Sequence, residues 1–268
     1  MKIGIIGCGA IGSTLAKAAE EIEEVEEIYI FDKSHVCSRM MEEKFTKVTS
    51  ILSIEELILN SDFIAEAASQ EAVTLFAKKV LESGKSILIM SVGALVDDSL
   101  REDLIKTAKQ QNCRIYLPTG AICGIDGICS ASSSKIDEVT LITRKPPGAF
   151  EDVDYVKDMG IDLGNLDSPR VLFEGKASEA VKLFPKNVNV AATVSLAGIG
   201  FDRTKVKIIA DPATDNNHHT IEAKGKFGSL RAEVDNLPFE RNPKTSRMAA
   251  QSAISALKKI VNTFWVGV

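Results

Sequence analysis

The chain has 268 residues, and at roughly 150 residues per domain this length indicates two domains. Hydrophobic residues make up 45% of the sequence, which is enough for a buried core. The net charge is −5, and no long block of like charges occurs. This balance argues against electrostatic binding to nucleic acid or to anionic lipid, so we expect neither as a partner.

The five cysteines are odd in number and include no CxxC pair, which favours reduced thiols in a cytoplasmic protein. We expect no metal site. The longest apolar stretch, residues 188–201, is too short to cross a bilayer and contains Asn189. The first predicted strand begins at residue 2, so we expect neither a signal peptide nor a transit peptide.

Residues 2–32 follow the pattern of a dinucleotide-binding unit. An apolar run at residues 3–6 predicts a strand, and the turn GCGAIG at residues 7–12 follows it at once. Apolar residues then recur in steps of four and three up to Val25, which predicts a helix. A second apolar run, residues 28–31, ends in Asp32. Such a unit places its ribose-binding acid at this distance from the last glycine of the turn.

Each glycine of the turn has a physical role in this interpretation. Gly7 allows the sharp turn, Gly9 lets the backbone approach a pyrophosphate, and Gly12 lets the helix pack on the sheet. The start of the helix offers N–H groups and a positive dipole end to the phosphates. Asp32 accepts hydrogen bonds from ribose hydroxyls and therefore favours NAD, while Lys33 and Ser34 leave NADP open.

The rest of the first half alternates helices with strands. The predicted strands are residues 63–65, 86–90 and 114–117, and the predicted helix caps are Ser53, Ser69 and Ser99. We interpret Ser53 with Glu56, and Ser99 with Glu102, as capping boxes. This order predicts an α/β fold with a Rossmann-type, doubly wound parallel sheet. Segments 66–69 and 91–94 follow strands, so each either borders the ligand cleft or is an ordinary turn.

A second domain of α+β type begins near Pro118, where segment 120–127 is rich in glycine. The predicted strands are residues 139–143, 171–174, 206–210 and 220–234. The last of these alternates apolar with charged residues, as a sheet with one solvated face does. Ser178 is a predicted helix cap, and Pro185 suits the first turn of the next helix.

A final helix is predicted after Asn242 and Pro243, with apolar residues on one face between Met248 and Ile260. We expect it to pack back on the nucleotide-binding domain. The predicted domains are therefore residues 1–118 together with 243–268 for the dinucleotide, and residues 119–242 for catalysis and dimerisation.

Of the three histidines, His35 follows Asp32 and is expected in a loop, solvated or near the adenosine. His218 and His219 open a strand, where neighbouring side chains point to opposite faces. An imidazole suits proton transfer near neutral pH. The residues alone do not choose between His218 and His219, and a surface position for both is an equal alternative.

Several further motifs are spread over almost the whole chain in order. They are TGAICGID at residues 119–126, TRKPP at 143–147, LFPKNVNVAA at 183–192, NHHTI at 217–221 and NPKTS at 242–246. With the glycine turn, these segments make the chain resemble the L-aspartate dehydrogenases. The FPKNVN and NHHTI segments are the most specific part of this resemblance.

The resemblance implies site residues. The histidine of Asn-x-His-x-Ile matches His219 and implies the catalytic acid/base, with His218 as a bystander. The cofactor-binding residues that we expect, from the turn and from the resemblance together, are Gly7, Gly9, Ala10, Ile11, Gly12, Asp32, Cys123 and Asn189. Cys123 stands where relatives often carry alanine or glycine.

The resemblance also implies NAD- or NADP-dependent oxidative deamination of L-aspartate to iminoaspartate, then oxaloacetate and ammonia, with a role in NAD biosynthesis. A homodimer is implied as well. Candidates for binding the substrate carboxylates are Lys182, Lys186, Asn187 and Arg203. The alternatives are a related two-domain reductase, of the dihydrodipicolinate reductase or homoserine dehydrogenase kind, and a dinucleotide sensor without catalysis. In the first of these reductases a basic motif with lysine is expected near the histidine, whereas Thr220, Ile221 and Glu222 follow His219 here.

Overall fold

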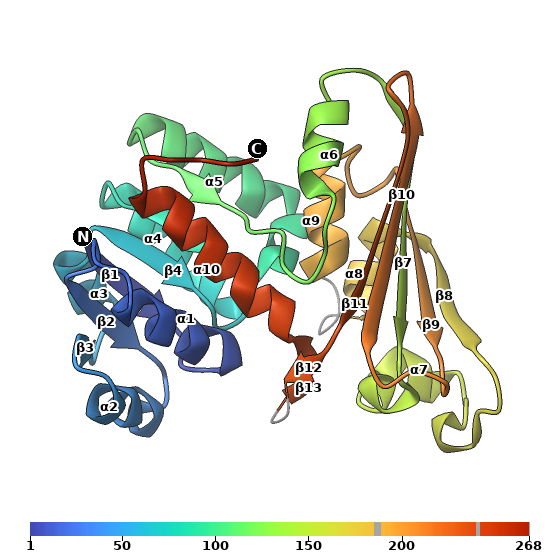
Figure 1. Cartoon of the computed structure of the whole chain (residues 1–268), viewed down its shortest axis with the longest axis horizontal. Helices are drawn as coiled ribbons and strands as arrows, with labels where there is room; N and C mark the ends of the chain where they lie inside the picture. Colours follow the sequence, from blue (N-terminus) through green and yellow to red (C-terminus); the bar gives the residue numbers. More distant parts are fainter. Residues whose placement is uncertain (185–188, 240–241, 268) are drawn as a thin grey trace. The chain divides into compact units, whose positions relative to one another are not determined.

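The computed structural model of the chain describes residues 1–184, 189–239 and 242–267. The chain forms two compact units, shown in Figure 1. Unit 1 contains Met1–Gly120 and Ala250–Trp265, and unit 2 contains Ala121–Ala249 with residues 266–268.

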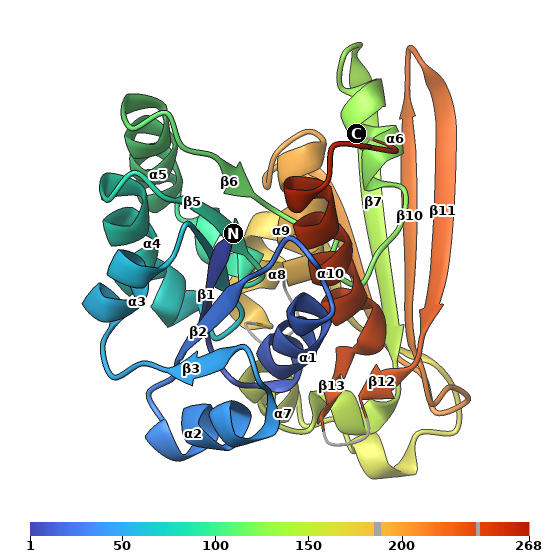
Figure 2. The same ribbon diagram turned by 60° about the vertical axis from the view of Figure 1, so that its left-hand side comes forward.

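Unit 1 is built on a six-stranded sheet in the order β3-β2-β1-β4-β5-β6, with all neighbours parallel (Figure 2). The strands are β1 (Lys2–Ile6), β2 (Glu27–Phe31), β3 (Val48–Ser50), β4 (Phe63–Glu66), β5 (Ser86–Ile89) and β6 (Ile115–Tyr116). This strand order is that of the dinucleotide-binding doubly wound fold, and it reverses between β1 and β4. The predicted fold class is therefore confirmed.

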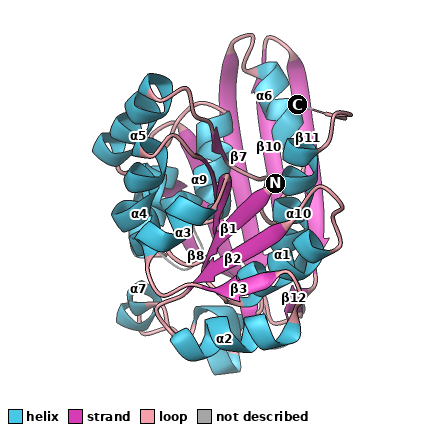
Figure 3. Cartoon of the chain, turned by 90° about the vertical axis from the view of Figure 1, so that its left-hand side faces the viewer, coloured by secondary structure: helices cyan, strands magenta, loops and turns pink. Residues whose placement is uncertain are grey.

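Helices cover both faces of this sheet, as Figure 3 shows. They are α1 (Ala10–Glu20), α2 (His35–Lys44), α3 (Ile54–Asn60), α4 (Gln70–Glu82), α5 (Asp98–Gln110) and the 3₁₀ helix η1 (Val92–Val96). The central strands are almost wholly apolar and buried, as expected for a sheet covered on both sides. His35 begins α2 and is exposed, so the prediction that it lies in a loop was wrong.

The predicted caps of these helices are partly right. Ser53 accepts a hydrogen bond from Glu56 N, and Ser69 accepts one from Ala72 N. The Ser99–Glu102 box is wrong, because Asp97 caps α5 by accepting from Leu100 N. An aspartate two residues upstream competes for the same free amides, and its carboxylate forms the cap.

Unit 2 contains a mixed five-stranded sheet in the order β11-β10-β7-β9-β8. Its strands are β7 (Ile136–Lys145), β8 (Arg170–Lys176), β9 (Thr204–Ala210), β10 (Asn217–Gly225) and β11 (Gly228–Asn236). β7 and β9 are parallel, and the other neighbours are antiparallel. The predicted strand 220–234 is in fact the hairpin β10–β11. Gly228 at φ +113° follows Gly225 in its turn, a conformation that glycine adopts easily.

One face of this second sheet carries helices α6 (Ile125–Ala131), α8 (Ala177–Leu183) and α9 (Asn189–Ala197). Smaller elements are η2 (Pro147–Phe150), α7 (Asp154–Asp158), η3 (Leu163–Asn165), β12 (Pro238–Phe239) and β13 (Asn242–Ser246). Ser178 does not cap a helix, because α8 begins at Ala177 and the Ser178 hydroxyl donates to Asp202. The predicted role of Pro185 falls outside the described residues.

The last helix, α10 (Arg247–Val261), joins unit 1 from Ala250 onward. Ala250, Ala253 and Leu257 are buried, and the Ser252 hydroxyl accepts a hydrogen bond of 3.0 Å from Gly120 N. The expectation that the last helix packs on the Rossmann unit is therefore confirmed. Within the described ranges, none of the helices combines the length and apolar character that crossing a bilayer requires.

Candidate functional site

The glycine-rich turn between β1 and α1 is as tight as the sequence predicts. Gly7 has φ +103°, and a Cβ built there would lie 2.8 Å from the carbonyl oxygen of Ala67. A Cβ on Gly12 would lie 2.0 Å from the carbonyl oxygen of Gly7. In contrast, a Cβ on Gly9 would meet no atom within 4 Å. Gly7 and Gly12 are thus required by packing, whereas the space over Gly9 is open to a ligand.

A cavity of about 400 Å³ opens beside this turn in unit 1. Apolar side chains from α4 and β2 form much of its wall, and Asp32 and Lys33 add charge. The lining residues are Ile6, Gly7, Gly9, Phe31, Asp32, Lys33, Ala67, Ala68, Ser69, Glu71, Ala72, Leu75 and Phe76. An apolar cleft with a few polar groups, at the carboxyl ends of β1, β2 and β4, fits the adenosine end of a dinucleotide.

The Asp32 carboxylate already holds the loops around this cavity. Its Oδ2 accepts from Cys8 N at 2.7 Å, and its Oδ1 accepts from Ser34 N at 2.8 Å. Asp32 therefore fixes the glycine turn against the end of β2 and also lines the cavity. Ala10 and Ile11 form the first turn of α1, where the N–H groups of a helix favour an anion.

Glu66 is a buried acid at the end of β4 that sequence reasoning did not single out. Its Oε1 accepts from Ala68 N at 2.8 Å, from Ser69 N at 3.0 Å and from the Ser91 hydroxyl at 2.8 Å. Its Oε2 accepts from Ser91 N at 3.0 Å. Burial raises the pKa of Glu66, and these hydrogen bonds oppose the rise. One side chain thus joins the two strand-end segments that were cleft candidates.

His219 lies on the helix-covered face of the second sheet and is 2% exposed. It pairs with Thr143 across β10 and β7, and a hydrogen bond of 3.0 Å joins His219 Nδ1 to Thr143 Oγ1. Burial, and then the positive charge of Lys145 and His218, lower the pKa of His219 to about 3. The imidazole is therefore neutral near pH 7, and its Nε2 is the ring nitrogen left to exchange a proton.

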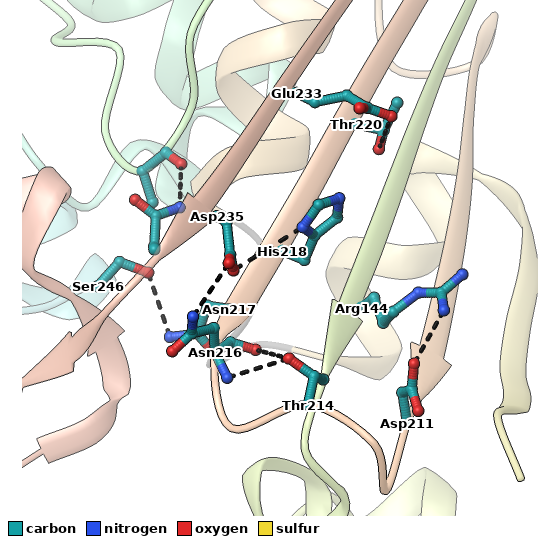
Figure 4. A network of polar contacts seen from close by, with 12 residues as sticks. Arg144, Asp211, Thr214, Asn216, Asn217, His218, Thr220, Glu233, Asp235 and Ser246 are labelled. Atoms are coloured by element: carbon teal, nitrogen blue, oxygen red, sulfur yellow. Dashed lines mark hydrogen bonds and ion pairs between the residues drawn. The ribbon is translucent and has the colours of Figure 1, made fainter.

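His218 points to the opposite, solvated face of the sheet, as the strand geometry predicts. Its Nδ1 lies 3.8 Å from Asp235 Oδ1, and its side chain is 35% exposed. Figure 4 shows this face, where Arg144 Nη1 donates to Asp211 Oδ2 at 2.8 Å. The two neighbouring histidines therefore experience different surroundings, and only His219 is held on the buried face.

Lys145 lies two residues beyond Thr143 on β7, and therefore on the same face of the sheet. It is 5% exposed, and burial lowers the pKa of its ammonium to about 8. Sequence reasoning missed this residue, although the alternation of Val139, Leu141 and Thr143 places Lys145 on the buried face.

The other predicted site residues lie in unit 2. Cys123 precedes α6, and its thiol donates to the carbonyl oxygen of Glu233 at 3.4 Å. Asn189 is exposed at the start of α9. Among the predicted carboxylate-binding residues, Lys182 is exposed, and Arg203 Nη2 donates to the Ile136 carbonyl oxygen at 3.2 Å. Lys186 and Asn187 lie outside the described residues.

Two family models match the chain and together cover nearly all of it. Residues 126–260 match the family model described as aspartate dehydrogenase, C-terminal. Residues 7–118 match the model described as homoserine dehydrogenase, NAD binding domain. These two matches correspond to the second sheet and to the glycine turn with its parallel sheet.

Several named relatives resemble the chain over its full length. An L-aspartate dehydrogenase of Methanosarcina barkeri is 49% identical, with 100% of this chain and 99% of the relative covered. One of Nitrosopumilus maritimus is 40% identical, with 96% of each covered. The crystal structure of aspartate dehydrogenase from Thermotoga maritima matches with a TM-score of 0.78 at 29% identity, covering 100% and 99% of the two chains. A hyperthermophilic archaeal homoserine dehydrogenase in complex with NADPH shares the fold, with a TM-score of 0.59 at 13% identity.

Proposed function

Because the chain belongs to the aspartate dehydrogenase family, we propose that it catalyses the NAD(P)-dependent oxidative deamination of L-aspartate. The single observation that carries this proposal is the full-length similarity to L-aspartate dehydrogenases, of which five are 42–50% identical. A non-catalytic sensor would have no need for a buried, neutral histidine at the position of the family's acid/base.

The residues of unit 1 fit a dinucleotide. The open space over Gly9, the N-terminus of α1 and the cavity beside Phe31 and Leu75 supply a phosphate position and an apolar wall. We propose that Gly7, Gly9, Ala10, Ile11, Gly12 and Asp32 contact the cofactor there, and that Cys123 and Asn189 are cofactor-binding residues as well. Asp32 would repel a 2′-phosphate, so NAD is the proposed preference.

The proposed reaction removes a hydride from Cα of L-aspartate and a proton from its amino group, which leaves iminoaspartate. Bound NAD(P) supplies the hydride acceptor. Water then adds to the imine carbon, and loss of ammonia gives oxaloacetate. His219 is the proposed acid/base for these proton transfers, because the resemblance assigns this role to its position and Thr143 binds only Nδ1 of the ring. Thr143 holds Nδ1 and so orients the ring.

Resemblance to the same family supports a proposal for the biological setting. We propose a cytoplasmic homodimer whose iminoaspartate is either hydrolysed or used as a precursor in NAD biosynthesis. The solvated face of the second sheet, with His218 and Arg144, is the proposed dimer surface.

The test replaces His219 with alanine. Turnover of L-aspartate, followed by the absorbance of NADH, should fall by roughly 100-fold or more, while the Kd for NAD stays unchanged. The His218→Ala variant is the matched control and should keep its turnover. Unchanged turnover in His219→Ala would reject the proposed acid/base.

The substrate assignment is tested on the wild type with L-aspartate, L-homoserine and dihydrodipicolinate under the same conditions. L-Aspartate should be the substrate with the highest kcat/KM. Turnover of homoserine or dihydrodipicolinate alone would contradict the proposal and favour a related reductase.

A further inference from the structure

Lys145 occupies a position in the second sheet where the sequence otherwise places uncharged side chains. Val139, Leu141 and Thr143 precede it on the buried face of β7 and are 0%, 1% and 4% exposed. In the register of the sheet, Lys145 pairs with the buried Ala210 of β9. The ammonium group is therefore held on the helix-covered face rather than in solvent.

This position is costly for the fold. Burial lowers the pKa of Lys145 to about 8, which shows that the charged form is disfavoured relative to water. A buried charge lowers stability even where it is hydrogen-bonded, and an apolar side chain of similar volume is often more stable there. A residue that costs stability at such a position is typical of a functional site.

The charge of Lys145 acts on His219. Burial is the largest cause of the lowered pKa of the imidazole, and the charge of Lys145 is the second largest. A ligand that exchanges a proton with His219 therefore lies within the same positive field. L-Aspartate carries two carboxylates, and each needs a cationic or amide partner when it leaves water.

The carboxylate-binding residues expected from the sequence are less suitable. Lys182 is exposed on α8, and the Arg203 guanidinium bonds to the carbonyl oxygens of Ile136 and Asp137. Among the residues of the chain that the structure describes, Lys145 is the lysine whose charge lowers the pKa of His219, and it lies on the same buried face of the sheet.

We propose that Lys145 is a substrate-binding residue whose ammonium, on the His219 face of the second sheet, pairs with a carboxylate of the dicarboxylate substrate. This role rests on the function proposed above. The proposal adds Lys145, from the TRKPP segment, to the site and assigns this lysine the role of recognising the negative charge of the substrate.

The experiment compares Lys145→Met, which removes the charge at similar volume, with Lys145→Arg, which keeps it. Lys157→Met is the matched control, because Lys157 lies on α7 outside the sheet, with its side chain 56% exposed. The measurements are kcat and KM for L-aspartate, Ki for succinate and for its monoamide succinamate, and Kd for NAD.

In Lys145→Met, the KM for L-aspartate and the Ki for succinate should each rise roughly 30-fold or more. The Kd for NAD should stay within about twofold, and the preference for succinate over succinamate should shrink. Lys145→Arg should recover part of the loss, since the guanidinium keeps the charge but has another shape. Lys157→Met should match the wild type.

Two results would overturn the proposal. One is a KM for L-aspartate and a Ki for succinate in Lys145→Met within about twofold of the wild type. The other is an equal loss of NAD affinity, which indicates general damage. If the wild type does not turn over L-aspartate but binds succinate with a Kd that still depends on Lys145, the proposed function fails while carboxylate binding stands.

Discussion

At the scale of single residues, the hydrogen bond between Thr143 and His219 decides what the imidazole can do. With Nδ1 occupied by the Thr143 hydroxyl at 3.0 Å, the ring has a fixed orientation. A threonine hydroxyl can donate or accept, so this bond fixes the direction in which Nε2 points in either tautomer of the ring.

We therefore predict that Thr143→Val lowers kcat roughly tenfold or more, because valine keeps the shape but loses the hydroxyl. Thr143→Ser keeps a hydroxyl and should retain most of the activity. The check is steady-state kinetics together with the Kd for NAD, which should not change in either variant. Equal activity of the valine and serine variants would show that the hydrogen bond has no role in orienting the ring.

Single residues also show where sequence reasoning ends. The turn glycines and Asp32 were identifiable because each satisfies a rule of spacing. His219 could be distinguished from His218 only by family resemblance, since two neighbours on a strand differ in face but not in type. Lys145 was missed because a lysine is usually interpreted as a solvated charge, and its burial depends on tertiary packing.

At the scale of elements, Glu66 connects the loops that follow β4 and β5. It accepts two backbone N–H groups of the first loop and both the N–H and the hydroxyl of Ser91 in the second. Ala67, Ala68 and Ser69 of the first loop also line the cavity. The shape of the cofactor site thus depends on an acid behind its wall.

Glu66→Gln should destabilise the protein by about 2–3 kcal/mol and weaken NAD binding. The amide group replaces one acceptor oxygen by a donor, which then faces an N–H group without compensation. Urea unfolding and NAD titration measure the two effects. Glu55→Gln, at an exposed position in α3, is the control and should change neither quantity. A Glu66→Gln variant with wild-type stability and affinity would contradict this role.

The incorrect predictions concern where elements begin and end. Asp97 replaces Ser99 as the cap of α5 because both can bind the same free amides. In contrast, α8 begins at Ala177 with Lys176 at its N-cap, so Ser178 lies inside its first turn. The hairpin β10–β11 was interpreted as one strand, although Gly225 and Gly228 mark its turn. Periodicity thus identified the elements, while their ends depended on local competition.

At the scale of the whole molecule, the buried charge of Lys145 makes stability depend on pH. The pKa of Lys145 is about 8 in the folded protein and 10.5 as a model value, so it is lowered by folding. Between these two values the unfolded chain binds more protons, and the free energy of unfolding therefore rises with pH. Below about pH 8 the folded state carries the full cost of the buried charge, about 3 kcal/mol.

We predict that Lys145→Met is more stable than the wild type at pH 7, by up to about 3 kcal/mol, and that the difference decreases as the pH rises from about 8 to 10.5. Urea unfolding of both proteins across this pH range measures the difference in their free energies of unfolding. Groups that titrate alike in the two proteins do not contribute to this difference. A difference that does not change with pH would show that volume, rather than charge, is responsible.

The discontinuous composition of unit 1 has a consequence for the newly made chain. The parallel sheet is synthesised first, but Ala250–Trp265, which completes that unit, is made only after unit 2. Domains tend to fold during synthesis from the N-terminus onward. Until Ala253 and Leu257 have been made and buried, the apolar surface that they contact in unit 1 therefore remains exposed. A chain that stops before Ala250 would therefore expose this apolar surface, and chaperones are expected to bind it until α10 has been made.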